Sequence, residues 1–542
     1  MQKFLFVVFI FSLFFSACSS SKLSSSSNNI YQTQEKQNVA YSSSNSMMSN
    51  SSSISNGSTV GMDFKKEIGS DAETQGERYA AIEENPFLET GRTPLSTFSI
   101  DVDTASYANV RRYLNDGQLP PKDAVRIEEL VNYFEYDYPQ PIGDVPFSVN
   151  TEAATCAWNA KHKIVSIGLQ GRKVSLDNVP PSNLVFLIDV SGSMNDPRKL
   201  PLLKDALRIL VNQLSAKDRV AIVVYAGGSG LVLPSTNNRG EILNALENLE
   251  AGGSTDGGQG IRLAYKVALD NLIKDGNNRV ILATDGDFNV GLTGDAELVK
   301  LIESKRQNGI FLSVLGFGTG NTNDSMMEKL ADKGNGNYAY IDSPEEARKA
   351  LGEQAAGTLY TIAKDVKIQV EFNPAKVAGY RLLGYENRLL ADRDFNDDKK
   401  DAGEIGAGHS VTALYEIIPA GQKIEDNGVD ELRYAKTASS KTAFNDELLT
   451  VKLRYKEPNQ NASKLLTQGL LDAEKSIENA SDNLRFASSV AEFGLLLRNS
   501  RYKGNSSFDN IKSLAESSFG NDLKSHRSDF VSLLKKAKHL QD

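Results

Sequence analysis

Hydrophobic and polar positions divide this chain into stretches of different period. From Asn183 onward, continuous apolar runs alternate with stretches in which apolar residues recur every three or four positions. Such runs indicate strands buried on both faces, and the stretches between them indicate amphipathic helices. The apolar runs are 184–188, 220–225, 280–283 and 311–315. This alternation predicts an α/β fold over residues 180–358, with a central doubly wound, mostly parallel sheet.

The regions on either side follow other patterns. Residues 93–179 contain an alternating strand at 98–102, two helical stretches and further strands, typical of a small α+β module. After the α/β region, apolar and polar residues alternate at 366–372 and 449–455 and predict antiparallel strands. Helical spacing follows them. We therefore expect residues 359–542 to form a β-sandwich or sheet together with helices.

The start of the chain has the pattern of a secretory leader. A positive start, an apolar run from Phe4 to Phe15 and small residues before Cys18 predict a signal peptide at 1–17. A cysteine placed directly after small residues resembles the bacterial lipobox, which implies a lipid anchor on Cys18. Phe15 departs from the aliphatic residue usual in that motif. The alternative is an incidental cysteine in a plain leader.

Residues 18–92 have the composition of a tether. Serine and asparagine dominate as far as Thr59, and such a stretch cannot bury enough apolar surface to offset its chain entropy. We expect this segment to be disordered and to act as a flexible spacer between the membrane and the folded part of the chain.

Charge and composition exclude several classes of function. The formal net charge is −9, so the chain has no general attraction to nucleic acid. Its four histidines are too far apart for an H-E-x-x-H metal site, and its two cysteines exclude a disulfide framework. The sequence contains no G-x-x-x-x-G-K-[ST] motif and no G-x-S-x-G motif. We expect neither a nucleic acid nor a nucleotide as partner.

Oxygen-bearing side chains follow two of the predicted buried strands. Asp189, Ser191 and Ser193 follow the first, and Asp285 follows a later one, while Thr255 lies in a glycine-rich loop between them. Ligands gather beyond the carboxyl ends of strands in an open α/β sheet. An all-oxygen set suits a hard divalent cation such as Mg²⁺, with Mn²⁺ and Ca²⁺ also open. The alternative is that these residues act only in turns and helix caps.

This assembly resembles the metal-ion-dependent adhesion site of the von Willebrand factor A domain. Asp189, Ser191 and Ser193 match its D-x-S-x-S loop, Thr255 its threonine, and Asp285 its second aspartate. The resemblance implies that the three hydroxyls bind the metal directly and the two carboxylates bind it directly or through water. It also implies an open sixth position, which takes an Asp or Glu carboxylate of a protein partner.

The similarity extends beyond that domain. The segments 99–107, 394–408 and 485–498 together resemble bacterial YfbK-type lipoproteins. That resemblance covers roughly residues 93–540 and implies a family-specific N-terminal region, a central A domain and a family-specific C-terminal region.

Together these features predict a lipid-anchored protein of the cell envelope that binds a protein partner through a metal and is not an enzyme. We expect it at the outer membrane or periplasmic face rather than at the cytoplasmic membrane. One alternative is an envelope scaffold whose metal only stabilises the fold. A metal-dependent hydrolase would need a general base near the ion, for which Asp256 and Asp287 are the candidates.

Asp101 and Asp103 form a further acidic pair on one face of the strand expected at 98–102. They permit a second metal site, but helix capping and surface exposure also account for them. We favour the second interpretation.

Overall fold

The structure is a computed structural model and describes residues 76–175, 179–226, 230–253, 257–286, 295–320, 322–424, 446–458 and 460–541. The chain divides into two units, Met1–Asp71 and Ala72–Asp542, and all described residues belong to the second. The expected leader, Cys18 and most of the expected tether therefore lie outside the described residues.

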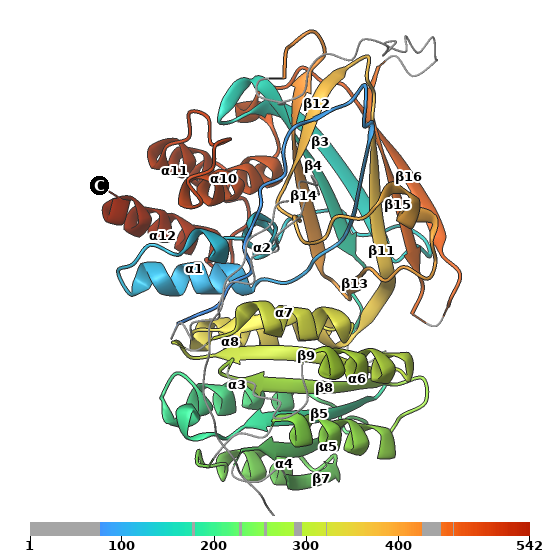
Figure 1. Cartoon of the computed structure of the whole chain (residues 1–542), viewed down its shortest axis with the longest axis vertical. Helices are drawn as coiled ribbons and strands as arrows, with labels where there is room; N and C mark the ends of the chain where they lie inside the picture. The colour runs from blue at the N-terminus through green and yellow to red at the C-terminus, as the bar shows by residue number, and fades with distance from the viewer. Residues whose placement is uncertain are drawn as a thin grey trace, which may run out of the picture. The chain divides into compact units, whose positions relative to one another are not determined.

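Six strands of the described chain form the predicted α/β sheet (Figure 1), in the order β10-β9-β8-β5-β6-β7. Neighbouring strands are parallel except β7, which is antiparallel to β6. The doubly wound, mostly parallel sheet is confirmed. Its strands are β5 Ser182–Asp189, β6 Arg219–Tyr225, β7 Gly230–Thr236, β8 Asn277–Thr284, β9 Ile310–Phe317 and β10 Tyr338–Ile341.

Helices cover both faces of this sheet because alternate residues of its strands face opposite ways. Phe186 of β5 packs in the hydrophobic cluster that contains Leu207 of α3. Its neighbour Leu187 packs in another cluster, with Ile261 of α5 and Leu330 of α7. The helices are α3 Leu200–Gln213, α4 Arg239–Glu247, α5 Gly257–Asp270, α6 Asp295–Gln307, α7 Asp324–Lys333, α8 Pro344–Arg348 and α9 Ala355–Leu359.

The remaining strands build a sandwich of two antiparallel sheets. One sheet has the order β1-β12-β14-β4-β3, and in the other β13-β11-β15-β16 is joined by β2, which pairs with β11. Phe98, Ile167, Val370, Tyr415 and Leu453 meet in the core between them. The strands are β1 Leu88–Glu89, β2 Leu95–Ser99, β3 Phe147–Cys156, β4 Asn159–Gly171, β11 Thr361–Phe372, β12 Val377–Leu383, β13 Gly403–Gly406, β14 Ser410–Pro419, β15 Glu447–Lys456 and β16 Lys464–Leu471.

Both sheets mix strands from before and after the α/β region. Strand β4 pairs with β14, and β2 pairs with β11. The two flanking regions, which the sequence pattern presents as successive modules, thus share one core, since each supplies strands that the other needs as neighbours. Residues 76–92, expected to belong to the tether, are also built in: Leu88–Glu89 pairs with β12, and Glu77 accepts hydrogen bonds from Arg112 and Tyr113.

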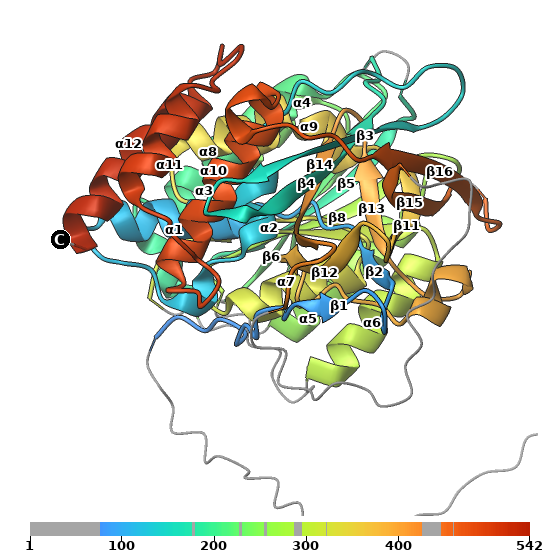
Figure 2. The ribbon, with the colours of Figure 1, turned by 90° about the horizontal axis from the view of Figure 1, so that it is seen from above.

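Helices from both flanking regions pack on the sheet that contains β3, β4 and β14. Figure 2 shows α10, α11 and α12 lying together on one side of these strands. Tyr107, Phe134, Phe486, Phe493 and Phe530 form an aromatic centre there, with ring centroids 4.9–5.7 Å apart. The helices are α1 Ala105–Asn115, α2 Ile127–Asn132, α10 Asp482–Leu497, α11 Phe508–Glu516 and α12 His526–Gln541.

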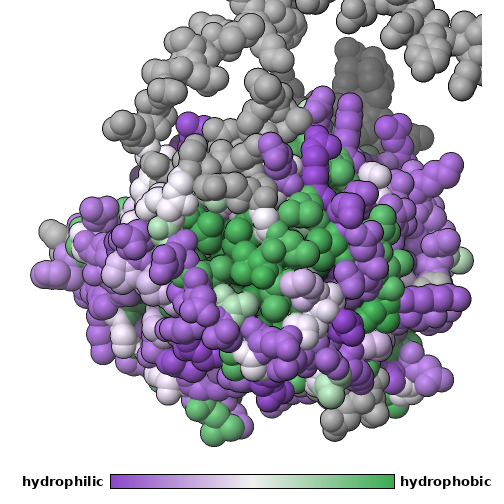
Figure 3. All heavy atoms as spheres, turned by 90° about the horizontal axis from the view of Figure 1, so that it is seen from below, coloured by the Kyte–Doolittle hydropathy of each residue, from purple (hydrophilic) through white to green (hydrophobic). Residues whose placement is uncertain are grey.

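The α/β sheet ends at the edge strand β7, which lies on the side of the molecule shown in Figure 3. That view shows apolar side chains gathered in the middle of the face. Leu231 and Val232 of β7 are 44% and 43% exposed. Across the described residues, no helix combines the length and the apolar character needed to cross a membrane.

Candidate functional site

The first oxygen ligands predicted from the sequence lie at the carboxyl end of β5. Asp189 is the last residue of this buried strand, and the 3-10 turn Gly192–Asn195 follows at once. The backbone amide of Ser191 donates to Asp189 Oδ1 at 2.8 Å, which fixes the turn. The hydroxyl oxygens of Ser191 and Ser193 lie 2.9 Å apart. The two serine hydroxyls therefore meet at the turn whose backbone the Asp189 carboxylate holds.

Asp285 lies at the same edge because β8 is the parallel neighbour of β5, with Ile188 opposite Ala283. The charge of Asp285 acts on Asp189. Burial raises the pKa of Asp189 above its ordinary value and Asp285 raises it further, whereas the hydrogen bonds from Ser191 oppose the shift. We call Asp189, Ser191, Ser193 and Asp285 the oxygen cluster.

The glycine-rich loop adjoins the oxygen cluster. The backbone amide of Gly252 donates to Val190 O at 2.7 Å, and that of Gly192 donates to Gly253 O at 3.4 Å. These bonds hold Gly253, two residues before Thr255, against the turn. Thr255 itself lies outside the described residues, as do the candidate bases Asp256 and Asp287, so the fifth predicted ligand stays a prediction.

Three residues that sequence reasoning missed hold the cluster in place. Tyr225, the last residue of β6, donates its hydroxyl to Asp189 Oδ2 at 3.1 Å, and Thr284 donates to the same oxygen at 3.4 Å. Lys199 lies with its Nζ 2.8 Å from Asp285 Oδ2. No local spacing could have revealed Lys199, because Asp285 lies 86 residues later in the chain.

The oxygen cluster fits a hard divalent cation by its chemistry. Its described members offer two carboxylates and two hydroxyls, and hydroxyl and carboxylate oxygens are ligands that Mg²⁺ accepts. Asp189 and Asp285 are buried, whereas Gly192, Ser193, Gly252 and Gly253 are exposed and form the outer rim. The cluster thus has a negative floor and a side open to a ligand.

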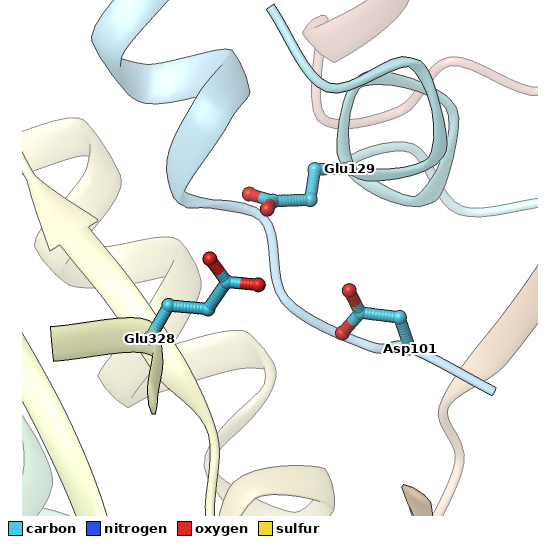
Figure 4. A group of neighbouring side chains, drawn as sticks. All are labelled: Asp101, Glu129 and Glu328. Carbon is cyan, nitrogen blue, oxygen red and sulfur yellow. The ribbon is translucent and has the colours of Figure 1, made fainter. Parts of the chain in front are cut away.

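A second group of carboxylates lies inside the protein. Asp101, Glu129 and Glu328 each bring a carboxylate oxygen within 4.8 Å of the other two, and all three side chains are buried. Figure 4 shows them turned toward one another from the loop before α1, from α2 and from α7. We call these three residues the acidic cluster.

Two arginines compensate the acidic cluster. Arg126 lies 2.8 Å from Glu328 and 3.4 Å from Glu129, and Arg388 lies 3.2 Å from Asp101 and 3.6 Å from Glu328. The backbone amide of Ser106 donates to Glu129 at 2.8 Å. The cluster is therefore an ion-pair network that joins α7 of the α/β domain to α2 and to the loop after β12.

The interpretation of Asp101 and Asp103 as exposed was wrong. They are 5% and 4% exposed, and burial and the charge of Asp101 raise the pKa of Asp103 well above its ordinary value while Arg388 opposes the shift. Asp103 also makes no cap for α1: its Oδ1 accepts from the backbone amide of Tyr338 at 2.8 Å. The N-cap residue Thr104 makes no side-chain capping bond either.

Three family models match the chain. A model described as von Willebrand factor type A domain matches residues 184–287, the range that contains all five predicted metal ligands. A model described as von Willebrand factor matches residues 73–166, and one described as uncharacterized protein YfbK, C-terminal, matches residues 357–540. The matches cover the first part of the α/β domain and much of both flanking regions, and they leave residues 288–356 unmatched.

Among curated relatives, uncharacterized protein YfbK of Escherichia coli K12 is 43% identical over 479 residues, which cover 86% of this chain and 82% of that protein. Inter-alpha-trypsin inhibitor heavy chain H3 of Pongo abelii is 26% identical over 262 residues, 44% of this chain and only 29% of that protein. A solved von Willebrand factor type A structure from Catenulispora acidiphila aligns with 74% of this chain and 92% of that chain, at 17% identity and a TM-score of 0.40.

Proposed function

This chain belongs to the YfbK family, and from that premise we propose that it binds a protein partner through a divalent cation held by the oxygen cluster. The cation is Mg²⁺ in this proposal, and the partner presents an Asp or Glu carboxylate. The chain contains a von Willebrand factor type A domain, and its relatives with such domains support a binding or scaffold role. The metal in the site and the carboxylate on the partner are our proposal.

One observation carries the proposal. Asp189, Ser191 and Ser193 converge at the carboxyl edge of the sheet, and Asp285 reaches the same edge from the neighbouring strand. Turn formation explains the bond from the Ser191 amide, but it does not require the Ser191 and Ser193 hydroxyls to meet 2.9 Å apart beside a second buried carboxylate. A hard cation explains why the two hydroxyls meet and why a second carboxylate lies beside them.

The residues of the oxygen cluster would have different roles in binding the cation. Ser191 and Ser193 would hold the cation through hydroxyls, while Asp189 and Asp285 would supply the negative charge. The cation, when bound, offers an electrophilic position to a carboxylate. Tyr225 keeps Asp189 oriented, and the exposed rim leaves that position accessible. Because charged contacts gain strength where water is excluded, such a bridge gives a specific interface.

The test is metal-dependent capture of a partner from the intact cell envelope by crosslinking and pull-down. The wild-type chain should capture a partner in Mg²⁺ and lose it in chelator, and Asp189→Ala should capture none. Asp205→Ala is the matched control, since this aspartate is on the exposed surface of α3 with its side chain 58% accessible. Capture that persists in chelator would refute the proposal. Stabilisation by metal without any metal-dependent partner would favour the scaffold alternative.

We also propose that the protein is held in the envelope by a lipid on Cys18, at the outer membrane or periplasmic face. The leader pattern before Cys18 supports this, and two or more acyl chains give stable anchoring. Cys18→Ser should move the protein from the membrane fraction to the soluble fraction and remove labelling by radioactive palmitate. Cys156→Ser, which changes a buried cysteine of the folded body, is the control that should stay in the membrane. Unchanged membrane association of the Cys18 variant would contradict the anchor.

A further inference from the structure

Lys199 places a positive charge on the oxygen cluster. Its Nζ lies 2.8 Å from Asp285 Oδ2, and the two side chains are only 13% and 2% exposed. An exposed ion pair would be weak, but a pair this shielded from water is held firmly. The location is unusual, because Lys199 is the N-cap residue of α3 and the dipole of that helix repels a cation. Asp285 is the group that makes the position tolerable.

The neighbouring loop leaves room for the Lys199 side chain. A Cβ at Gly318 would clash with Cγ, Cδ and Cε of Lys199, so the stem crosses the space that this glycine leaves empty. Gly318 has a φ of +76°, a conformation that favours glycine, and its carbonyl accepts a hydrogen bond from Tyr340. The loop after β9 therefore has the shape that a lysine stem needs on its way to Asp285.

We infer that Lys199 is a built-in competitor of the metal: its ammonium occupies Asp285 in the metal-free protein and must leave Asp285 when a divalent cation binds. This inference rests on the proposed function. With Lys199 in place, one of the two carboxylates of the cluster is already neutralised. A dication that entered beside the ammonium would meet a like charge within a few ångströms, which opposes binding.

A cavity beside Gly318 offers space for the released side chain. Its volume is about 560 Å³, and its carboxylates Asp342 and Glu345 are already paired with Arg111 and Arg348. The flexible four-carbon stem can turn from Asp285 into this space without unfolding α3. Lys199 therefore lowers the affinity for metal without blocking it, and the site changes between a lysine-closed and a metal-loaded form.

The experiment is calorimetric titration of the folded chain with Mn²⁺ as the probe. Lys199→Met keeps most of the stem and removes the charge, so it should bind Mn²⁺ about tenfold or more tightly than wild type. Lys199→Arg keeps the charge and should stay near wild type. Arg198→Met is the matched control, since this neighbouring cation is 53% exposed and pairs with Asp196 instead. Its affinity should not change.

Gly318→Ala provides a second route to the same result. The added methyl group clashes with the Lys199 stem and, at a φ of +76°, also strains the backbone of this loop. The lysine charge stays in the sequence, so folded Gly318→Ala should again bind Mn²⁺ more tightly than wild type. Equal or weaker binding by folded Lys199→Met would overturn the inference, and if that variant does not fold, the same result for Gly318→Ala would do so. In either case the proposed function would stand as long as Asp189→Ala abolishes binding. If Asp189→Ala binds Mn²⁺ as wild type does, the proposed function itself fails.

Discussion

The oxygen cluster and the acidic cluster contain the same kind of group and handle its charge in opposite ways. In the acidic cluster, Arg126 and Arg388 reach across three parts of the chain and pair with every carboxylate. In the oxygen cluster, the described residues place one lysine on Asp285 and surround Asp189 with hydroxyls and one amide. Planar, permanently charged arginine forks bind carboxylates through several hydrogen bonds of fixed geometry, whereas a lysine ammonium is a point charge on a flexible stem.

The comparison separates structure from function. Carboxylates that hold elements together are buried and paired with arginine. The two carboxylates of the oxygen cluster lie at a sheet edge beside exposed glycines, and Asp285 pairs with a single lysine. Substitutions in the two clusters should therefore differ in what they change and by how much.

Arg388→Met should destabilise the protein most, by about 3–5 kcal/mol, because it leaves buried carboxylates without their charge partner. The measurement is the free energy of unfolding in urea. Arg393→Met changes an arginine whose side chain is 90% exposed and should have little effect. A loss below about 1 kcal/mol for Arg388→Met would mean that the acidic cluster is not the tie described here.

The second prediction concerns pH and the carboxylate one turn before Glu328. Burial raises the pKa of Asp324 from 3.8 to about 6, helped by the charge of Glu328. A carboxyl group with a raised pKa in the folded state takes up a proton on folding, so its contribution is full below pH 4 and is lost as pH rises through 6. Metal-free protein should therefore lose on the order of 3 kcal/mol from this group between pH 4 and pH 7.

Asp324→Asn should remove that part of the pH dependence, and urea unfolding at several pH values measures it. The amide keeps an oxygen for the hydrogen bonds from Tyr338 and Asn109. Asp205→Asn on the exposed surface is the control. An Asp324→Asn profile as steep as that of wild type would contradict the prediction.

In the oxygen cluster, Asp189→Ala should abolish stabilisation by metal. A ligand at about one hundred times its Kd stabilises the folded state by about 2.7 kcal/mol, so Mg²⁺ should raise the melting temperature of wild type and leave that of the variant unchanged. Differential scanning calorimetry with and without chelator gives the answer. An equal metal-induced shift in both proteins would place the metal elsewhere.

The smallest expected effect comes from Tyr225→Phe. It removes one hydrogen bond to Asp189 and should cost about 1 kcal/mol of stability. Tyr265→Phe is matched to it, because the hydroxyl of Tyr265 is buried and has no hydrogen-bond partner within the described part of the chain. That control should be neutral. Equal losses in the two variants would show that the bond to Asp189 contributes nothing.

The α/β sheet was predictable because its signal is local. Each apolar run reports a strand buried on both faces, and the helical period between runs reports the covering helices. The sharing of sheets between the flanking regions was not predictable, since the partner of a strand such as β4 lies far away in the chain at β14. The period of apolar residues in a strand shows which of its faces is buried, but it does not show which other strand pairs with it.

The same distinction applies to the two clusters. Asp189, Ser191 and Ser193 are close in sequence and follow a strong strand, so their convergence could be predicted. The role of Lys199 depends on Gly318 and Asp285, which different strands bring to it. The acidic cluster needs Glu129, Glu328 and Arg388 from three separate elements, and no local spacing relates them.

Anomalous diffraction from crystals grown with Mn²⁺ shows directly whether the oxygen cluster holds the cation. We expect a peak at the carboxyl end of β5, within about 2.2 Å of the Ser191 and Ser193 hydroxyl oxygens, with Lys199 turned away from Asp285. A peak between Asp101, Glu129 and Glu328, or none at the β5 edge at saturating Mn²⁺, would contradict it.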